Sequence, residues 1–264
     1  MSAKAFSRNR RKIFLLWIQI GLVFIMVICV GLLWLLFRSS LFRVREISVD
    51  GARLISPERF VPQISTQLVG ESVLRSLIGP RNILFWAVGG EYPEVSPYVF
   101  PALSRFRVDL SFFERKVVLH VEEREFFGIW CSYRKQCFAF DEQGILFNPV
   151  PQASGSLFLT ILDTNPGRYG VLGAPFLTRE TWVQNIMSVV LSLRNEGFGI
   201  ARISILDITL REWEIETDSG QAFRFDLAFI PDHFQGVLRE LHARFRNDSV
   251  LLDFRVPNRV YYRL

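Results

Sequence analysis

The chain has 264 residues, of which 50% are apolar and 22% charged, so it can form one large domain or two small ones beside a membrane segment. This apolar fraction excludes wholesale disorder. The formal net charge of +5 is matched by five cations near the N-terminus, Lys4, Arg8, Arg10, Arg11 and Lys12, with no acid among them. The rest of the chain is therefore neutral, and the charge gives no support to nucleic-acid binding.

Residues 13–37 contain no charged side chain and predict a transmembrane helix. At about 1.5 Å per residue, such a helix spans a hydrocarbon core of about 30 Å, and Trp17 and Trp34 lie near its two ends. The cations in residues 1–12 predict a cytoplasmic tail, with one membrane pass and the bulk of the chain outside the cytoplasm. A cleaved signal peptide is the alternative, but its apolar region is shorter and precedes a small-residue cleavage site. An uncleaved anchor is the better interpretation.

Residues 42–124 predict a small domain in the order β-α-α-β-β. Alternating apolar and polar residues over 44–49 indicate a strand, and Ser56-Pro57-Glu58 is typical of a helix start. A second short helix is expected over 72–78, and two further strands over 106–112 and 117–123. These elements can bury their apolar faces as a three-stranded sheet with two helices on one side.

Residues 125–264 predict a mixed β domain with two amphipathic helices, so the fold class is α+β. The first helix follows Thr178 as its expected N-cap, and the second covers 232–245. Alternation and turn residues predict the strands, which are expected at 126–131, 137–140, 145–147, 157–162, 203–206, 210–217, 222–227, 250–255 and 259–262.

Two cysteines outside the apolar segment, Cys131 and Cys137, flank a five-residue loop. Outside the cytoplasm they can form a cross-strand disulfide, and half of a metal site is the alternative. The three histidines, His120, His233 and His242, lack ligand-like spacing to them, which favours the disulfide.

The sequence contains no phosphate loop, nucleophile elbow, HExxH motif or paired CxxC motif. The carboxylates of residues 122–125 lie at a strand end, where charges usually face solvent. We therefore expect no enzymatic activity, no metal site, no cofactor and no small-molecule substrate.

The last two predicted strands are rich in β-forming residues. A strand at the edge of a sheet can accept a strand from a partner, through backbone hydrogen bonds and alternate side chains. The other interpretation is that these strands only complete the internal sheet.

The order of these features resembles the FtsQ/DivIB family of bacterial cell-division proteins. After the tail and apolar segment, residues 42–51 resemble the opening strand and glycine turn of the family's POTRA domain. Ser56-Pro57-Glu58 resembles the start of that domain's first helix. Residues 121–125, followed by Trp130, resemble the V-x-E-R-x-P…W junction between the family's two domains, with Glu125-Phe126 where a proline usually follows.

Two further motifs resemble the family. Asp141-x-x-Gly144 followed by Phe147 resembles its D-x-x-G-x-x-F turn, and residues 252–255 resemble its terminal I-D-L-R strand. The cysteine pair is not part of the family pattern.

The resemblance implies a non-enzymatic scaffold at the division septum, in the cytoplasmic (inner) membrane. Such proteins bind FtsB-type (DivIC-type) and FtsL-type bitopic partners and help control septal peptidoglycan synthesis. The partner-binding residues that it implies are Leu252, Asp253, Phe254, Arg255, Val260, Tyr261 and Tyr262. On this basis we expect Phe254→Asp to abolish partner binding while leaving the domain folded.

Two other functions fit the sequence less well. A POTRA protein of envelope assembly or secretion normally carries several POTRA units and a C-terminal barrel. A signal-anchored envelope enzyme needs a polar cluster around a nucleophile or metal.

Overall fold

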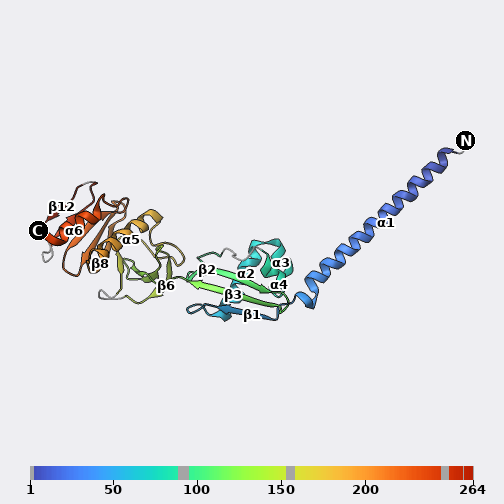
Figure 1. The fold of residues 1–264 in the computed structure, drawn as a ribbon, viewed down its shortest axis with the longest axis horizontal. Coiled ribbons are helices and arrows are strands. Elements are labelled where there is room, and N and C mark those ends of the chain that lie inside the picture. The colour runs from blue at the N-terminus through green and yellow to red at the C-terminus, as the bar shows by residue number, and fades with distance from the viewer. Residues whose placement is uncertain (1–2, 89–94, 153–157, 245–249, 258, 264) are drawn as a thin grey trace. The chain divides into compact units, whose positions relative to one another are not determined.

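The computed structural model describes residues 3–88, 95–152, 158–244, 250–257 and 259–263. Over these residues the chain is a mixed α+β protein with an apolar N-terminal helix and two sheets (Figure 1). Its contacts divide it into two compact units. Unit 1 contains residues 1–52, 56–93 and 106–120, and unit 2 contains residues 53–55, 94–105 and 121–264. The predicted first domain, 42–124, thus contributes three short segments to unit 2.

Helix α1, Ala3–Arg38, carries the apolar segment Leu16–Leu35, which is long and apolar enough to cross a membrane. Helix α1 begins at Ala3, so it also includes most of residues 1–12, the predicted cytoplasmic tail. Residues 3–12 contain neither proline nor glycine, so nothing in them ends a helix. The side chains of the five N-terminal cations lie outside the described residues.

The smaller sheet has the strand order β1-β3-β2, with β1 parallel to β3. Its strands are β1 (Glu46–Asp50), β2 (Leu103–Ser111) and β3 (Lys116–Glu123). The preceding 3-10 turn, η1, covers Ser40–Phe42, and the helices are α2 (Pro57–Glu71), α3 (Val73–Ile78) and α4 (Ile83–Ala87).

Helices α2 and α4 supply the helical side of this core. Phe60 of α2 packs edge-on against Phe106 of β2, with ring centroids 6.2 Å apart. Helix α4 is absent from the predicted order, because five residues are too few to display helical periodicity. It begins where the Asn82 side chain accepts a hydrogen bond from the Leu84 N–H (3.0 Å), and it buries Phe85 and Trp86.

The larger sheet has the strand order β12-β11-β10-β9-β8-β7-β4-β5-β6. Its strands are β4 (Gly128–Cys131), β5 (Cys137–Phe140), β6 (Leu146–Val150), β7 (Thr160–Asp163), β8 (Ile200–Asp207), β9 (Glu212–Thr217), β10 (Ala222–Asp226), β11 (Leu251–Asp253) and β12 (Tyr261–Arg263). The pairs β4–β7, β7–β8 and β10–β11 are parallel, so the sheet is mixed.

Helices α5 (Glu180–Asn195) and α6 (Phe234–Arg244) pack on one face of this sheet. The buried face of α5 includes Trp182, Ile186 and Leu193, as its sequence pattern predicts. The prediction of Thr178 as its N-cap is wrong, because the cap position is Arg179. The opposite face of the sheet carries charged side chains over β8 to β11.

Candidate partner-binding edge at the terminal strands

Strands β11 and β12 form one end of the larger sheet. In β11, Leu252 lies opposite Phe223 of β10 in a parallel pairing and opposite Tyr262 of β12 in an antiparallel pairing. Since β12 is the last strand on this side of the described sheet, its outer side is a sheet edge. Residues of both predicted terminal strands are thus paired in the sheet, and of these two strands only β12 lies at the sheet edge.

The side chains of Leu252 and Phe254 point into the core, where each is 1% exposed. Phe254 stacks on Phe225 with ring centroids 5.3 Å apart and packs edge-on against Phe234 of α6 at 5.4 Å. Strand alternation explains this placement, because every second residue of a sheet with one covered face points into the core.

The structure therefore limits the contacts that two of the expected partner-binding residues can make. Leu252 and Phe254 cannot offer their side chains to a partner while the domain is folded, because the core already surrounds them. Phe254→Asp places a carboxylate among aromatic rings, so we expect this change to unfold the domain and not to leave it folded as the sequence alone suggested.

Asp253 and Arg255 point to the opposite, charged face and pair with each other. Arg255 Nη2 donates to Asp253 Oδ2 at 2.6 Å, Nε donates to Oδ1 at 2.9 Å, and Nη1 donates to Glu212 of β9. The hydrogen bond from Arg255 lowers the pKa of Asp253 below its ordinary value, against the opposing effect of burial. The same bond raises the pKa of Arg255.

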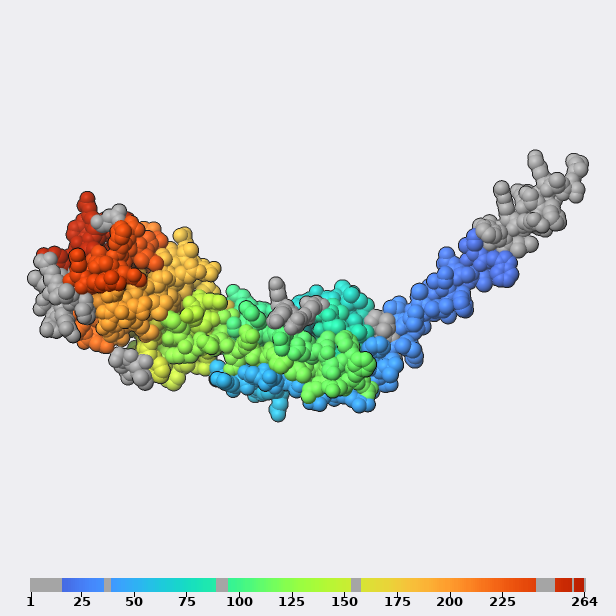
Figure 2. Space-filling view, in the orientation of Figure 1, coloured from blue at the N-terminus to red at the C-terminus, as the bar shows by residue number. Residues whose placement is uncertain are grey.

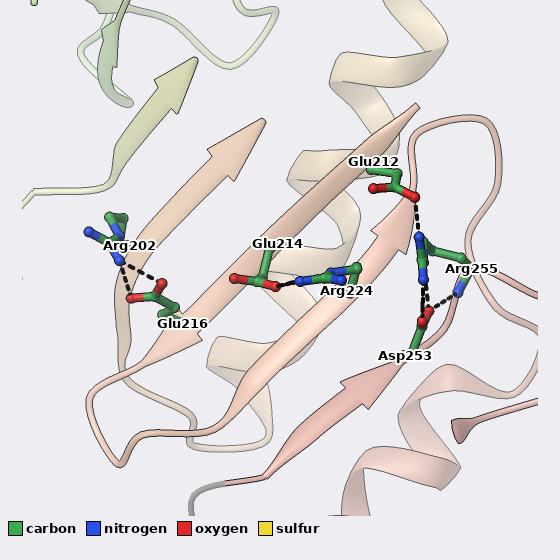
Figure 3. A network of polar contacts seen from close by, with 7 residues as sticks. All are labelled: Arg202, Glu212, Glu214, Glu216, Arg224, Asp253 and Arg255. Atoms are coloured by element: carbon green, nitrogen blue, oxygen red, sulfur yellow. Dashed lines mark hydrogen bonds and ion pairs between the residues drawn. The ribbon is translucent and has the colours of Figure 1, made fainter. Parts of the chain in front are cut away.

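This pair belongs to a row of ion pairs that crosses four strands (Figure 3). Beside it, Arg224 of β10 donates to Glu214 of β9 at 2.7 Å, and Arg202 of β8 donates to Glu216 at 2.5 and 2.6 Å. These glutamate partners were not among the residues predicted from the sequence. The signal was present in residues 212–216, where glutamates alternate with Trp and Ile at the period of a strand.

Strand β12 presents two tyrosines at the sheet edge. Tyr261 is 51% exposed and Tyr262 is 58% exposed, and Val260, just before the strand, is also exposed. The red C-terminal segment reaches the surface of its unit in the space-filling view (Figure 2). Large amphipathic side chains beside an open strand edge are typical of a surface that accepts a partner strand.

The opposite edge of the sheet, β6, is unsuited to strand addition. Pro149 lies within it and has no N–H to offer a neighbouring strand. Leu146 is already bonded by a following loop, since its N–H donates to Ala174 O (2.9 Å) and its carbonyl accepts from the Gly173 N–H (2.7 Å). The two edges of the described sheet therefore differ, and β12 is the one available for backbone pairing.

A residue of the predicted junction motif contacts a residue of the predicted turn motif. Arg124 Nη1 donates to Asp141 Oδ2 at 2.5 Å, with both side chains at least 90% buried. Asp141 Oδ1 also accepts the N–H groups of Gln143 and Ile145, which fixes the turn that Gly144 closes with a positive φ of 77°. These motif residues therefore organise the backbone around one turn.

Glu123, which precedes Arg124, holds a second segment. Its Oε1 accepts the backbone N–H groups of Arg53, Leu54 and Ile55 at 2.8, 2.7 and 2.9 Å. One carboxylate oxygen thus satisfies three consecutive donors of the loop after β1, which is a strong, charge-assisted arrangement.

Cys131 and Cys137 lie directly opposite each other on β4 and β5 and form a disulfide. Ile129 and Leu162 pack around the bond. Within the described residues, no group of three or more His, Cys, Asp and Glu side chains is placed to hold a metal ion.

No protein-family model and no curated protein matches the chain.

Proposed function

We propose that this protein is a divisome scaffold of the FtsQ/DivIB type, which acts by binding and not by catalysis. In this proposal α1 spans the cytoplasmic membrane with its N-terminus inside. The β1-α2-α3-α4-β2-β3 module is then a POTRA domain, and the larger sheet is the β domain that receives FtsB-type (DivIC-type) and FtsL-type partners at the septum.

The observation that carries the proposal is the contrast between the two edges of the larger sheet. Strand β12 borders the sheet with exposed tyrosines, whereas Pro149 and a bonded loop block the β6 edge. A partner segment that adds as a strand at β12 gains backbone hydrogen bonds along its length, and its side chains can contact Tyr261 and Tyr262. A scaffold that recruits partners needs such a site and needs no catalytic group.

Two further features support the proposal. The apolar helix is long enough to cross a membrane, as a single-pass scaffold requires. The contact between Arg124 and Asp141 gives the two resembling motifs a common structural purpose, because both meet at the turn of residues 141–144.

A charged-edge variant tests the binding site. The double change Tyr261→Lys with Tyr262→Lys places two cations at the edge without removing a buried side chain. We expect it to weaken binding of the FtsB/DivIC-type partner from the same organism at least about tenfold, or ~1.4 kcal/mol. Leu210→Lys, at an exposed position in the turn between β8 and β9, is the matched control and is expected to bind normally. Unchanged binding by the double variant would rule out the β12 edge.

The cellular role has its own test. A fluorescent fusion of the chain, expressed in its native bacterium, is expected to gather at the division site, and depletion is expected to give filaments. Uniform envelope fluorescence with normal septation would refute the division role.

A further inference from the structure

Two consecutive phenylalanines form the tip of the turn between β2 and β3. Phe113 is fully exposed, and Phe112 is about half exposed. The turn itself does not require them, because its left-handed residue is Arg115, with φ 57°. Gly, Asn, Asp, Pro or Ser usually occupies such a turn, and each does so for a backbone reason that Phe cannot supply. Two aromatic rings in this position therefore need another explanation.

The turn is bonded to the segment that leaves the membrane helix. Arg115 Nη1 donates to the carbonyl of Ser40 at 2.8 Å, and the carbonyl of Arg115 accepts the Arg45 N–H at 2.8 Å. Lys116 lies opposite Glu46 in the strand register, and their side chains pair at 3.0 Å. The β2–β3 end of the sheet accordingly lies beside the C-terminal end of α1 (Figure 1).

The few residues between the apolar segment and Ser40 set the depth of the β2–β3 turn relative to the membrane. Ser39 still donates a helical hydrogen bond to Leu35 O at 3.0 Å, and the charge-free apolar run ends at Phe37. Helix α1 ends at Arg38, which lies about 1.5 Å beyond Phe37 along the axis, and the two residues after it add at most about 7 Å. Ser40 therefore lies within about 9 Å of Phe37. The headgroup region on each side of the hydrocarbon core is about 5–8 Å thick. A turn bonded to Ser40 is therefore held at headgroup depth when α1 spans the membrane.

The side chains around the tip match an anionic lipid surface. Leu41 of η1 is exposed beside the contact. The nearby carboxylates are Glu46, which is paired with Lys116, and Glu114, which accepts a hydrogen bond from Ser111 Oγ at 3.2 Å. Cations outnumber them at this end of the sheet and are Arg43, Arg45, Arg81, Arg115 and Lys116. Arg81 belongs to the same end, because its carbonyl accepts the Val44 N–H at 2.8 Å. Aromatic rings with flanking cations are typical of segments that lie in the membrane interface.

We infer that the turn of residues 111–116 is an interfacial anchor, in which Phe112 and Phe113 insert into the headgroup region of the membrane that α1 spans. The cations beside it then face lipid phosphates. The anchor gives the smaller sheet a second attachment to the bilayer and limits its rotation about the end of α1. This inference depends on the membrane span of α1 and is independent of a role in division.

Depth-dependent fluorescence quenching in the full chain tests the anchor. Phe113→Cys, made with Cys29→Ala, leaves one reactive thiol, because the other two cysteines form the disulfide. The thiol is labelled with an environment-sensitive dye, and the chain is placed in nanodiscs of phosphatidylcholine and phosphatidylglycerol. Quenching by nitroxide lipids and by aqueous iodide is then measured.

Leu54→Cys in the same background is the matched control. Leu54 is also exposed and belongs to the same loop as the three N–H groups that Glu123 binds, at the other end of β3 from Lys116. Seven residues of β3, or about 23 Å of strand, separate Lys116 from Glu123. Neither change removes a buried side chain, so both variants are expected to fold.

We expect nitroxide lipids to quench the dye at position 113 at least about threefold more than at position 54, and iodide to do the reverse. Equal quenching at the two positions by each agent would overturn the inference, because the turn would then lie in water. Protection of position 113 from both agents would overturn it too, since the tip would then be covered by protein, such as a second copy of this chain.

Discussion

Truncation of Phe254 offers the sharpest test of the sheet that carries the proposed site. The side chain is 1% exposed and contacts aromatic rings on β10 and α6. Removal of a buried phenylalanine costs about 3–5 kcal/mol, from lost transfer free energy and from the cavity left behind. Each aromatic pair contributes about 0.5–1.5 kcal/mol beyond its buried area, and Phe254 forms such pairs with Phe225 and Phe234. We therefore expect Phe254→Ala to fall in the upper part of that range.

The assay is urea unfolding of the full chain, followed by near-ultraviolet circular dichroism, which reports aromatic packing. Tyr261→Ala is the control. Its side chain lies at the exposed edge, so we expect its free energy of unfolding to stay within about 0.5 kcal/mol of that of the unchanged protein. A loss below about 1 kcal/mol for Phe254→Ala would refute the reasoning. It would mean that β11 is shifted by one residue, with Asp253 and Arg255 directed inward.

Three further predictions concern polar groups and the disulfide. Glu123→Ala leaves three backbone N–H groups of residues 53–55 without their acceptor, and we expect a loss of about 1–3 kcal/mol in thermal or urea unfolding. Cys131→Ser opens a short disulfide loop to Cys137, and the chain-entropy estimate for so short a loop is a loss of about 2 kcal/mol, measured against the oxidised protein. Because Arg255 lowers the folded-state pKa of Asp253, their pairing stabilises the fold fully above the ordinary aspartate pKa of about 4. That stability is lost as the pH falls through the lower folded-state pKa. Asp253→Asn should therefore flatten the pH dependence of the unfolding free energy in this acidic range. An unchanged slope would show that the pair of Asp253 and Arg255 does not cause this pH dependence.

Local periodicity predicted most of the elements in this chain. The alternation in residues 117–123 and 222–227 indicated strands that the structure contains as β3 and β10, and the apolar face of α5 was readable from its spacing. Charge-free residues 13–37 indicated a membrane-length helix, which the structure contains within α1. These features are local, because each follows from side-chain type at a period of two or 3.6 residues.

The candidate site was predictable only in part. The terminal strands could be located in the sequence, but the sequence did not show which of their side chains, Phe254 among them, face the core. Strand alternation leaves the choice of face open until the helices that cover the sheet are known. The partners of Arg255 also depend on sheet order, since Glu212 lies 43 residues earlier and meets it only because β9, β10 and β11 are neighbours.

The sequence by itself determined that a long apolar helix precedes an α+β chain, because hydrophobic length and periodicity are properties of consecutive residues. The tertiary structure decided which edge of the larger sheet is open, since that depends on strand order and on the loop bonded to Leu146. It also placed the aromatic turn of residues 111–116 beside Ser40, through a hydrogen bond between residues 75 positions apart. Contacts of that separation come from the packing of the sheet as a whole, and no local pattern in the chain encodes them.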